Sequence, residues 1–335
     1  MRYLSIVLLV LTSNTFFAQT GGETVYNFLN IATSPKQIAL GGAILTSAKN
    51  VSQALWNPSS IYTDLDGDIA INYVNYIADI KAGSFVFAKS IKPEYGSVFL
   101  GVQYFNYGNL DRTDASGPNI LGVFSARDIA FSLGYAYQYE NLRFGASIKY
   151  ISSKIDTFTS SALLFDLAAT YTHPEISLIA ACSIRNLGNQ STHYLDRDEE
   201  VSNNIIFSLE YKLEHVPLKL FAAIDDIANW NISVPNPSNE KKNIDGSVVP
   251  EKIEWYQNAF RHISIGAELW SEKLINLRIG YNHRRAQEFK LSQARTNAGL
   301  SYGFGINAKK ISFDYAFSKF QQGSAYSTFG LTLHL

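Results

Sequence analysis

Apolar and polar residues alternate along most of the chain from residue 95 onward. Between 129 and 139, isoleucine, phenylalanine, leucine and tyrosine take almost every second position, and small or polar residues stand between them. Successive side chains of a strand point to opposite faces, so a period of two predicts β-strands with one apolar face. The same pattern recurs at 142–150, 298–306, 311–317 and 329–335.

The polar face of these stretches indicates where they fold. It consists mainly of Gly, Ser, Ala, Asn and Thr, whereas a soluble sandwich would expose Lys, Glu and Asp to water. Small polar groups suit the interior of a membrane barrel, and tyrosines near strand ends suit its interfaces. We therefore expect an all-β fold, a transmembrane antiparallel β-barrel of about fourteen strands with an N-terminal plug, and keep a soluble sandwich as the alternative. The strands are expected near 69–77, 80–91, 95–107, 127–139, 141–151, 161–171, 175–186, 202–213, 217–227, 260–270, 274–283, 296–306, 310–319 and 326–335.

The expected connections alternate in length, which predicts an orientation. Outer-membrane barrels have short periplasmic turns and longer outer loops. The tight connections follow even-numbered strands and are therefore expected to face the periplasm, while the long ones follow odd-numbered strands. The tight connections are 92–94, 140, 172–174, 214–216, 271–273 and 307–309, and the long ones are 108–126, 152–160, 187–201, 228–259 and 284–295.

The N-terminus, residues 1–18, is expected to be a cleaved signal peptide. Arg2 precedes an apolar stretch at 4–11, and Ala18 is the expected cleavage site. The formal net charge of −1 gives no reason to expect binding to nucleic acid. Cys182 is the only cysteine, which excludes an intrachain disulfide or a cysteine-based metal cluster.

Residues 19–68 precede the barrel, 69–335, and have helical or irregular character. A barrel of about fourteen strands encloses space that must be filled. We expect this segment to fill the lumen as a plug, with Trp56 packed against glycines of the inner face such as Gly134, Gly299 and Gly303. The alternative is a periplasmic tail.

Two motifs of this segment resemble the N-terminal plug of the FadL-like outer-membrane barrels. The first is Leu40-Gly41-Gly42-Ala43, and the second is Ala54-Leu55-Trp56-Asn57-Pro58-Ser59. The glycines allow a sharp bend of the backbone, and Asn57-Pro58 ends a helix because the residue before proline avoids the helical region. The resemblance implies that Leu40, Gly41, Gly42, Trp56, Asn57 and Pro58 form the core of a plug.

Nearly the whole chain after the signal is similar to the PorV/PorQ family of the type IX secretion system of Bacteroidetes. The similar stretches are 19–23, 26–30, 261–268, 277–285 and 301–305. The resemblance implies a place in the cell-surface attachment complex, where family members of the PorQ type hold the peripheral protein PorZ beside the sortase PorU and the shuttle PorV. That complex joins secreted cargo to lipopolysaccharide. One departure is the last residue, Leu335, where outer-membrane barrels usually have phenylalanine.

The candidate binding residues lie in two expected outer loops. Trp230, Trp255 and Tyr256, in the loop 228–259, are the residue types that often dominate docking surfaces, although a lid over the barrel mouth is the alternative. Arg284 and Arg285 have planar guanidinium groups that could bind lipopolysaccharide phosphates or a partner's carboxylates through paired hydrogen bonds. The alternative for these arginines, and for Arg295 at the far end of their loop, is a solvated strand end with salt bridges to Glu288 or Glu268.

We expect no catalytic residue, cofactor or metal. The acidic run 64–68 departs from the EF-hand calcium pattern, which makes a polar turn the simpler interpretation. Three functions of different class remain: an anchoring barrel of a secretion complex, a FadL-like transporter of hydrophobic small molecules, and an outer-membrane enzyme. The first is preferred, and no acid–base or nucleophile constellation favours the third.

Overall fold

The computed structural model describes residues 24–47, 49–76, 80–92, 94–113, 120–195, 198–233, 235, 240–243, 247–249, 251–289, 297–321 and 324–335. The expected signal peptide and Arg295 lie outside these residues. Among the residues described, no helix is long and apolar enough to cross a membrane.

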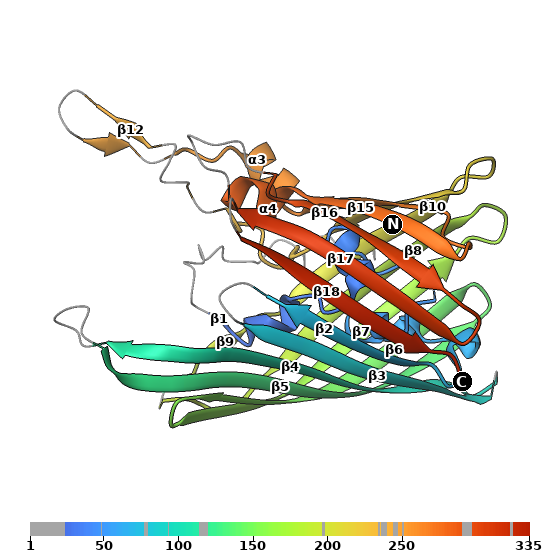
Figure 1. Ribbon diagram of the computed structural model, residues 1–335, viewed down its shortest axis with the longest axis horizontal. Coiled ribbons are helices and arrows are strands. Elements are labelled where there is room, and N and C mark those ends of the chain that lie inside the picture. Colours follow the sequence, from blue (N-terminus) through green and yellow to red (C-terminus); the bar gives the residue numbers. More distant parts are fainter. Residues whose placement is uncertain are drawn as a thin grey trace, which may run out of the picture.

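Fourteen antiparallel strands close into one barrel, and β18 pairs with β2 to complete it. Figure 1 shows the strands running along the long axis of the molecule. The expectation of fourteen strands is confirmed. The strands are β2 (Ile69–Asn75), β3 (Lys81–Lys92), β4 (Gly96–Thr113), β5 (Ile120–Tyr139), β6 (Leu142–Ile155), β7 (Phe158–Thr172), β8 (Leu178–Thr192), β10 (Asn204–Lys212), β11 (Leu218–Ile224), β14 (Ile263–Leu269), β15 (Ile275–Asn282), β16 (Leu300–Asn307), β17 (Ile311–Gln321) and β18 (Ser324–Leu333).

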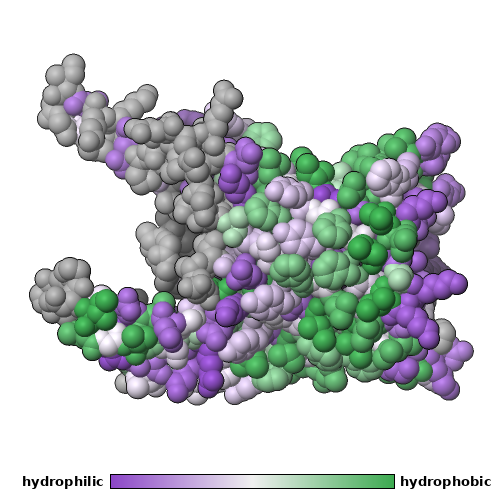
Figure 2. Space-filling model, in the orientation of Figure 1, coloured by the Kyte–Doolittle hydropathy of each residue, from purple (hydrophilic) through white to green (hydrophobic). Residues whose placement is uncertain are grey.

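The two faces of the barrel wall have opposite chemistry. On β2, Ile71 and Tyr73 point outward and are exposed, whereas Asn72 points inward and is buried. On the other strands, large apolar residues are exposed on the outside, while the inside buries Ser, Thr, Asn and charged residues together with an apolar cluster that includes Phe99, Phe105 and Ile151. On the face that Figure 2 shows, apolar residues form large patches over the wall, and hydrophilic residues line its edge at the tight turns. An apolar exterior around a closed sheet is the form in which strands cross a bilayer.

Before the barrel, the chain forms short elements that lie inside the wall (Figure 1). Their residues are largely buried and contact inward-facing positions all around the barrel, with α2 against β15 to β18, η2 against β2 to β4, and η3 against β5 to β7. We call residues 24–68 the luminal segment. Its elements are β1 (Thr24–Val25), η1 (Asn27–Asn30), α2 (Pro35–Ala39), η2 (Val51–Leu55), η3 (Pro58–Ser60) and η4 (Thr63–Leu65).

The two ends of the barrel differ. Tight turns and the C-terminus gather at one end, which we call the tight-turn end, and longer projections stand at the other, the loop end (Figure 1). The loop end carries α3 (Trp255–Arg261), α4 (His283–Glu288), the hairpin β12 (Lys241–Lys242) with β13 (Val248–Val249), and β9 (Glu200–Val201), which pairs in parallel with β1. Which end faces the periplasm stays a prediction.

Three expected loops are shorter than the sequence suggested. Strands β6 and β7 pair as far as Ile155 and Phe158, so the loop expected at 152–160 is a tight turn. Strand β8 continues to Thr192 into the loop expected at 187–201. Likewise, β4 and β5 extend into the loop expected at 108–126. The apolar alternation predicts strand ends where the apolar face ends, but backbone pairing continues past that point.

Candidate functional site: the luminal segment and the loop end

Barrel side chains bind the backbone carbonyls of the luminal segment. Gln103, on β4, donates from Nε2 to the carbonyls of Phe28 at 3.1 Å and Ile31 at 3.2 Å. The Phe28 carbonyl also accepts from the backbone N–H of Ile31, but the carbonyls after a short 3-10 helix have no partner within it, and buried carbonyls are costly when unpaired. The polar inner face of the wall therefore fixes an irregular segment that has little regular structure of its own.

Asn57 holds together the part of the luminal segment around the Trp-Asn-Pro motif. Its Nδ2 donates to the carbonyl of Leu45 at 3.1 Å and to Oγ1 of Thr170, on β7, at 3.2 Å. Its Oδ1 accepts from the backbone N–H of Ser59 at 3.0 Å, which caps η3 where Pro58 begins it. The side chain thus caps η3, binds the backbone at Leu45 and binds the wall.

Trp56 is buried, but against a partner other than the expected glycines. The guanidinium carbon of Arg185, on β8, lies 3.9 Å from the centre of the Trp56 ring, a cation–π contact. The Trp56 carbonyl accepts from Oγ of Ser183 at 2.8 Å. The expected packing is therefore wrong. The glycines lie elsewhere, with Gly134 under Phe99, Gly303 beside Ala39 and Gly299 beside Ala286.

Other glycines of the wall make room for the luminal segment. A Cβ on Gly280 would lie 2.3 Å from the backbone N of Gly41 and the carbonyl carbon of Leu40, and one on Gly145 would lie 2.2 Å from the backbone N of Ser59. Backbone therefore meets backbone at these two places. The sequence signal was available, because both glycines stand at inward positions of alternating strands.

The Gly41-Gly42 pair bends the luminal segment after α2. Both residues have positive φ, +107° and +104°, a region that residues with a Cβ rarely adopt. A Cβ on Gly41 would lie 3.3 Å from two barrel carbonyls, whereas one on Gly42 would meet nothing within 4 Å. The need for glycine at position 42 is therefore conformational.

Buried charges join the luminal segment to the wall. Nζ of Lys36, on α2, lies 3.7 Å from Oε1 of Glu268, on β14, and the same oxygen accepts from Nε of Arg278, on β15, at 2.8 Å. Arg278 also pairs with Asp314, on β17. Each charge has an opposite neighbour, which buried charges require.

A cavity of about 210 Å³ lies between the luminal segment and α4. Gly42 and Trp56 line it on the luminal side, and Asp225, Arg284 and Glu288 line it on the side of the loop end. A second cavity of about 200 Å³ is lined by Asn57, Tyr62 and Arg143, among others. The Trp56-Asn57 pair stands between the two cavities.

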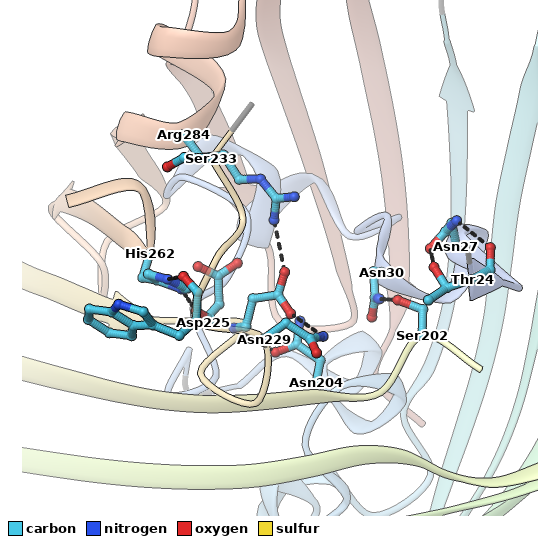
Figure 3. Close-up of polar contacts among 12 residues, drawn as sticks. Thr24, Asn27, Asn30, Ser202, Asn204, Asp225, Asn229, Ser233, His262 and Arg284 are labelled. Carbon is cyan, nitrogen blue, oxygen red and sulfur yellow. Dashed lines mark hydrogen bonds and ion pairs between the residues drawn. The ribbon is translucent and has the colours of Figure 1, made fainter. Parts of the chain in front are cut away.

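The two candidate arginines of α4 have partners within the chain. Arg284 donates to Oδ2 of Asp226 at 3.0 Å, the contact drawn in Figure 3, and to Oε1 of Glu288 at 2.9 Å. The salt bridge to Glu288 is one of the alternatives that the sequence left open. The other candidate, Arg285, donates to Oγ of Ser318 at 2.7 Å and of Ser301 at 3.0 Å. Both arginines therefore fix α4 to neighbouring elements.

Asp225 is the most perturbed acid at the loop end. Burial and the neighbouring carboxylate of Asp226 raise the pKa of its carboxyl, the positive charge of Arg284 opposes both, and together they raise the pKa to about 7. The backbone carbonyl oxygen of Asp225 lies 2.7 Å from Nδ1 of His262, and the backbone carbonyl oxygen of Trp230 lies 3.1 Å from Nε2 of the same ring (Figure 3). This histidine thereby holds the chain that leaves β11.

The three candidate aromatic residues differ in setting. The ring of Trp230 stacks on His262, with centroids 5.0 Å apart, and is only partly exposed. Trp255 begins α3 and is 74% exposed, and Tyr256 beside it is also exposed. The helix itself is fixed by a capping box between Glu254 and Gln257.

A two-stranded ribbon projects from the loop end, formed by 109–113 of β4 and 120–125 of β5. On the outward side of β5, Phe131 and Leu133 are apolar, and Arg127 follows them toward the tip of the ribbon. Arg127 lies opposite Lys154 of β6, so two cations stand side by side at this level. Leu121, 64% exposed, and Val123, 59% exposed, lie farther toward the tip. The ribbon differs from the loop expected at 108–126, because polar residues interrupt the apolar alternation there while backbone pairing continues.

The acidic run before the barrel has structural partners. Oδ1 of Asp66 accepts from the backbone N–H of Ser90 at 2.8 Å and lies 3.1 Å from Nζ of Lys89, while Asp68 pairs with His334 at 2.9 Å. Across the described part of the chain, no cluster of three or more His, Cys, Asp or Glu residues is arranged to hold a metal ion.

No protein-family model matches the chain, and no curated protein does. Solved structures similar to it are outer-membrane barrels. A structure titled "KdgM porin" covers 80% of this chain and 99% of its own, at 5% identity and a TM-score of 0.34. A mutant of the Rh. blastica porin covers 79% of this chain and 96% of its own, at 10% identity and a TM-score of 0.28. The outer membrane phospholipase A from Escherichia coli covers 90% of this chain and 98% of its own, at 10% identity and a TM-score of 0.27. Likeness at this level says nothing of activity or ligand.

The structure itself settles the location. A closed barrel of fourteen strands with an apolar exterior and a polar interior is stable only where lipid surrounds it. The chain is an outer-membrane β-barrel.

Proposed function

We propose that this outer-membrane barrel is a member of the PorV/PorQ family that anchors the peripheral protein PorZ at the cell surface. The attachment complex would then also contain PorU and PorV, with lipopolysaccharide beside them. The proposal is supported by the resemblance of stretches such as 261–268 and 277–285 to that family and by the architecture of the loop end. It makes the barrel a binding protein rather than an enzyme.

The projecting ribbon is the observation that carries the proposal. Leu121 and Val123 stand beyond Arg127 and Lys154 on the outward side of the ribbon, and we take these two cations as the edge of the lipid-facing surface. Apolar side chains that project together into water mark a surface for another protein. Green atoms on the ribbon in Figure 2 show this apolar surface apart from the barrel wall. We assign the ribbon, together with the rim around Trp230, to the docking of PorZ.

The luminal segment supports an anchor over a transporter. We propose that it acts as a plug, held by Gln103, Asn57, Arg185 and the pairs around Glu268. A transporter of hydrophobic molecules needs an open apolar path, whereas apolar residues of the inner wall such as Val86, Phe105 and Ile151 belong to one buried cluster with the luminal segment, and the other buried wall residues are mainly Ser, Thr, Asn and charged groups. Such groups disfavour apolar cargo because they lose hydrogen bonds to it.

The test removes the apolar surface of the ribbon. In cells carrying Leu121→Ser with Val123→Ser, we expect PorZ to leave the washed cell surface and cargo to keep its sorting domain. The control variant, Asp111→Asn with Ser125→Ala, changes outward polar residues of the same ribbon and should retain PorZ. Both variants should assemble, because neither changes a lipid-facing residue of the wall.

Two results would contradict the proposal. The first is PorZ retained at the wild-type level by the ribbon variant, by a variant shortened over 232–252 and by cells lacking the whole chain. The second is a loss of fatty-acid uptake in those cells with PorZ still attached, which would favour the transporter.

A further inference from the structure

Three aromatic side chains lie on the exposed side of α3. Trp255, Tyr256 and Phe260 are each exposed over about half of their surface or more, and the rings of Trp255 and Tyr256 touch edge to face at 6.2 Å between centroids. A helix of seven residues with three large exposed rings needs a cover.

The opposite side of α3 is fixed to the rim, so its aromatic side cannot turn inward. Asn258 is buried, accepts from Oγ of Ser233 at 2.6 Å and donates to the carbonyl of Trp230. Arg261, in the last turn, is also buried. The helix therefore holds its rings away from the polar contacts at the barrel mouth.

A chain of ring contacts connects α3 with the lipid-facing wall. The ring of Phe260 lies 5.9 Å from that of His283, which lies 6.0 Å from that of Tyr281. Tyr281 belongs to the outward side of β15, two positions from the exposed Ile279. Its partners in register are Ile265, on β14, and Leu300, on β16, both exposed on the outer face. The aromatic side of α3 thus continues the surface that meets lipid.

We propose that α3 lies in the membrane interface at the loop end, with Trp255, Tyr256 and Phe260 among the lipid headgroups and upper acyl chains. Tryptophan and tyrosine favour this depth because their rings are apolar and their N–H and O–H groups need polar partners. The occupant of this surface is membrane lipid, since the surface is continuous with the established lipid-facing wall. This assignment separates Trp255 and Tyr256 from the PorZ surface and does not depend on it.

Tryptophan fluorescence in vesicles tests the depth of α3. The full chain is folded into phosphatidylcholine vesicles, in variants that keep one tryptophan and replace the others by phenylalanine. We expect Trp255 to emit at short wavelength, to lose most of its fluorescence to lipid brominated high on the acyl chain, and to resist aqueous iodide. Trp270, exposed at the opposite rim, is the matched interfacial control, and the buried Trp56 should respond to neither quencher.

The proposal is wrong if iodide quenches Trp255 while brominated lipid does not. It is equally wrong if Trp255 becomes shielded from iodide only after PorZ is added, because the helix would then be part of the partner surface. Should the variants that lack Trp56 fail to assemble, the same quenching is measured as the difference between the native chain and Trp255→Phe.

Discussion

Arg185 and Trp56 join the barrel wall to the luminal segment: the guanidinium carbon lies 3.9 Å from the ring centre, and both side chains are buried. The same guanidinium donates to the carbonyl of Leu29 at 2.8 Å and to Oδ1 of Asn30 at 3.2 Å. One buried side chain thus holds two parts of the segment that are distant in sequence.

Replacing Arg185 with methionine should loosen the luminal segment. The change removes the cation–π contact and leaves the Leu29 carbonyl without its donor, a loss of about 2–4 kcal/mol. We expect faster proteolysis within residues 24–68 and a lower temperature for loss of compact migration in detergent gels. Arg127→Met, at an exposed arginine of β5, is the control and should leave both unchanged.

Gly145 should tolerate no side chain. In Gly145→Ala the new Cβ meets the backbone of Pro58 and Ser59, which cannot move aside, and overpacking of this kind costs about 1–3 kcal/mol. Ala146→Val adds bulk to the lipid-facing neighbour and should be neutral.

Gly42→Ala should cost about 1–2 kcal/mol, through backbone conformation alone. Thermal midpoints in one detergent rank the three variants, and a neutral Gly145→Ala would refute the close approach.

The buried charges around Glu268 should be much more sensitive than an exposed pair. Arg278→Met leaves both Glu268 and Asp314 without their main partner, and breaking a buried pair costs about 3–5 kcal/mol. Lys36→Met should cost less, because Arg278 still neutralises Glu268. Lys89→Met breaks the exposed pair with Asp66 and should change stability by less than about 1 kcal/mol. Urea unfolding in lipid vesicles measures all three, and equal effects would contradict the account.

The loop end should become less stable as pH rises toward 7. Asp225 has a folded-state pKa of about 7, raised from 3.8, so its carboxyl ionises in the unfolded state first. Each pH unit between these values then costs up to about 1.4 kcal/mol, and the effect is absent below pH 3.8 and complete above pH 7. Hydrogen exchange of residues 225–233 should slow between pH 7 and pH 5.5, after correction for the intrinsic rate. Asp225→Asn should abolish this pH dependence.

Much of the barrel was predictable from alternation alone. Most of the fourteen strands follow from apolar residues at every second position, because lipid demands an apolar face wherever a strand crosses. The ends were not predictable. On the ribbon, polar residues such as Asn109 and Asp111 interrupt the apolar face, yet pairing with Ser125 and Val123 continues. Backbone hydrogen bonds extend strands where side-chain pattern no longer does.

The interior was predictable in composition and not in detail. Small inner residues indicated a filled lumen, and Trp56 is buried as expected. Its contact with Arg185 was missed because it depends on where an irregular segment lies against a strand 129 positions away (185 − 56), which no local pattern encodes. For the same reason, the sequence offered the pair of Arg284 with Glu288 as an alternative but not the contacts of Arg284 with Asp226 and of Arg285 with Ser318, which only the fold brings together.

Photo-cross-linking at Leu121 tests the central proposal most directly. A photoreactive amino acid placed there, on cells that make the whole attachment complex, should yield an adduct that contains PorZ. The same amino acid at Ile279, on the lipid-facing side of β15, should yield no protein adduct. An adduct with PorZ at Leu121 alone is the result that the account predicts. No protein adduct at Leu121, in cells where PorZ is present and attached, would contradict it.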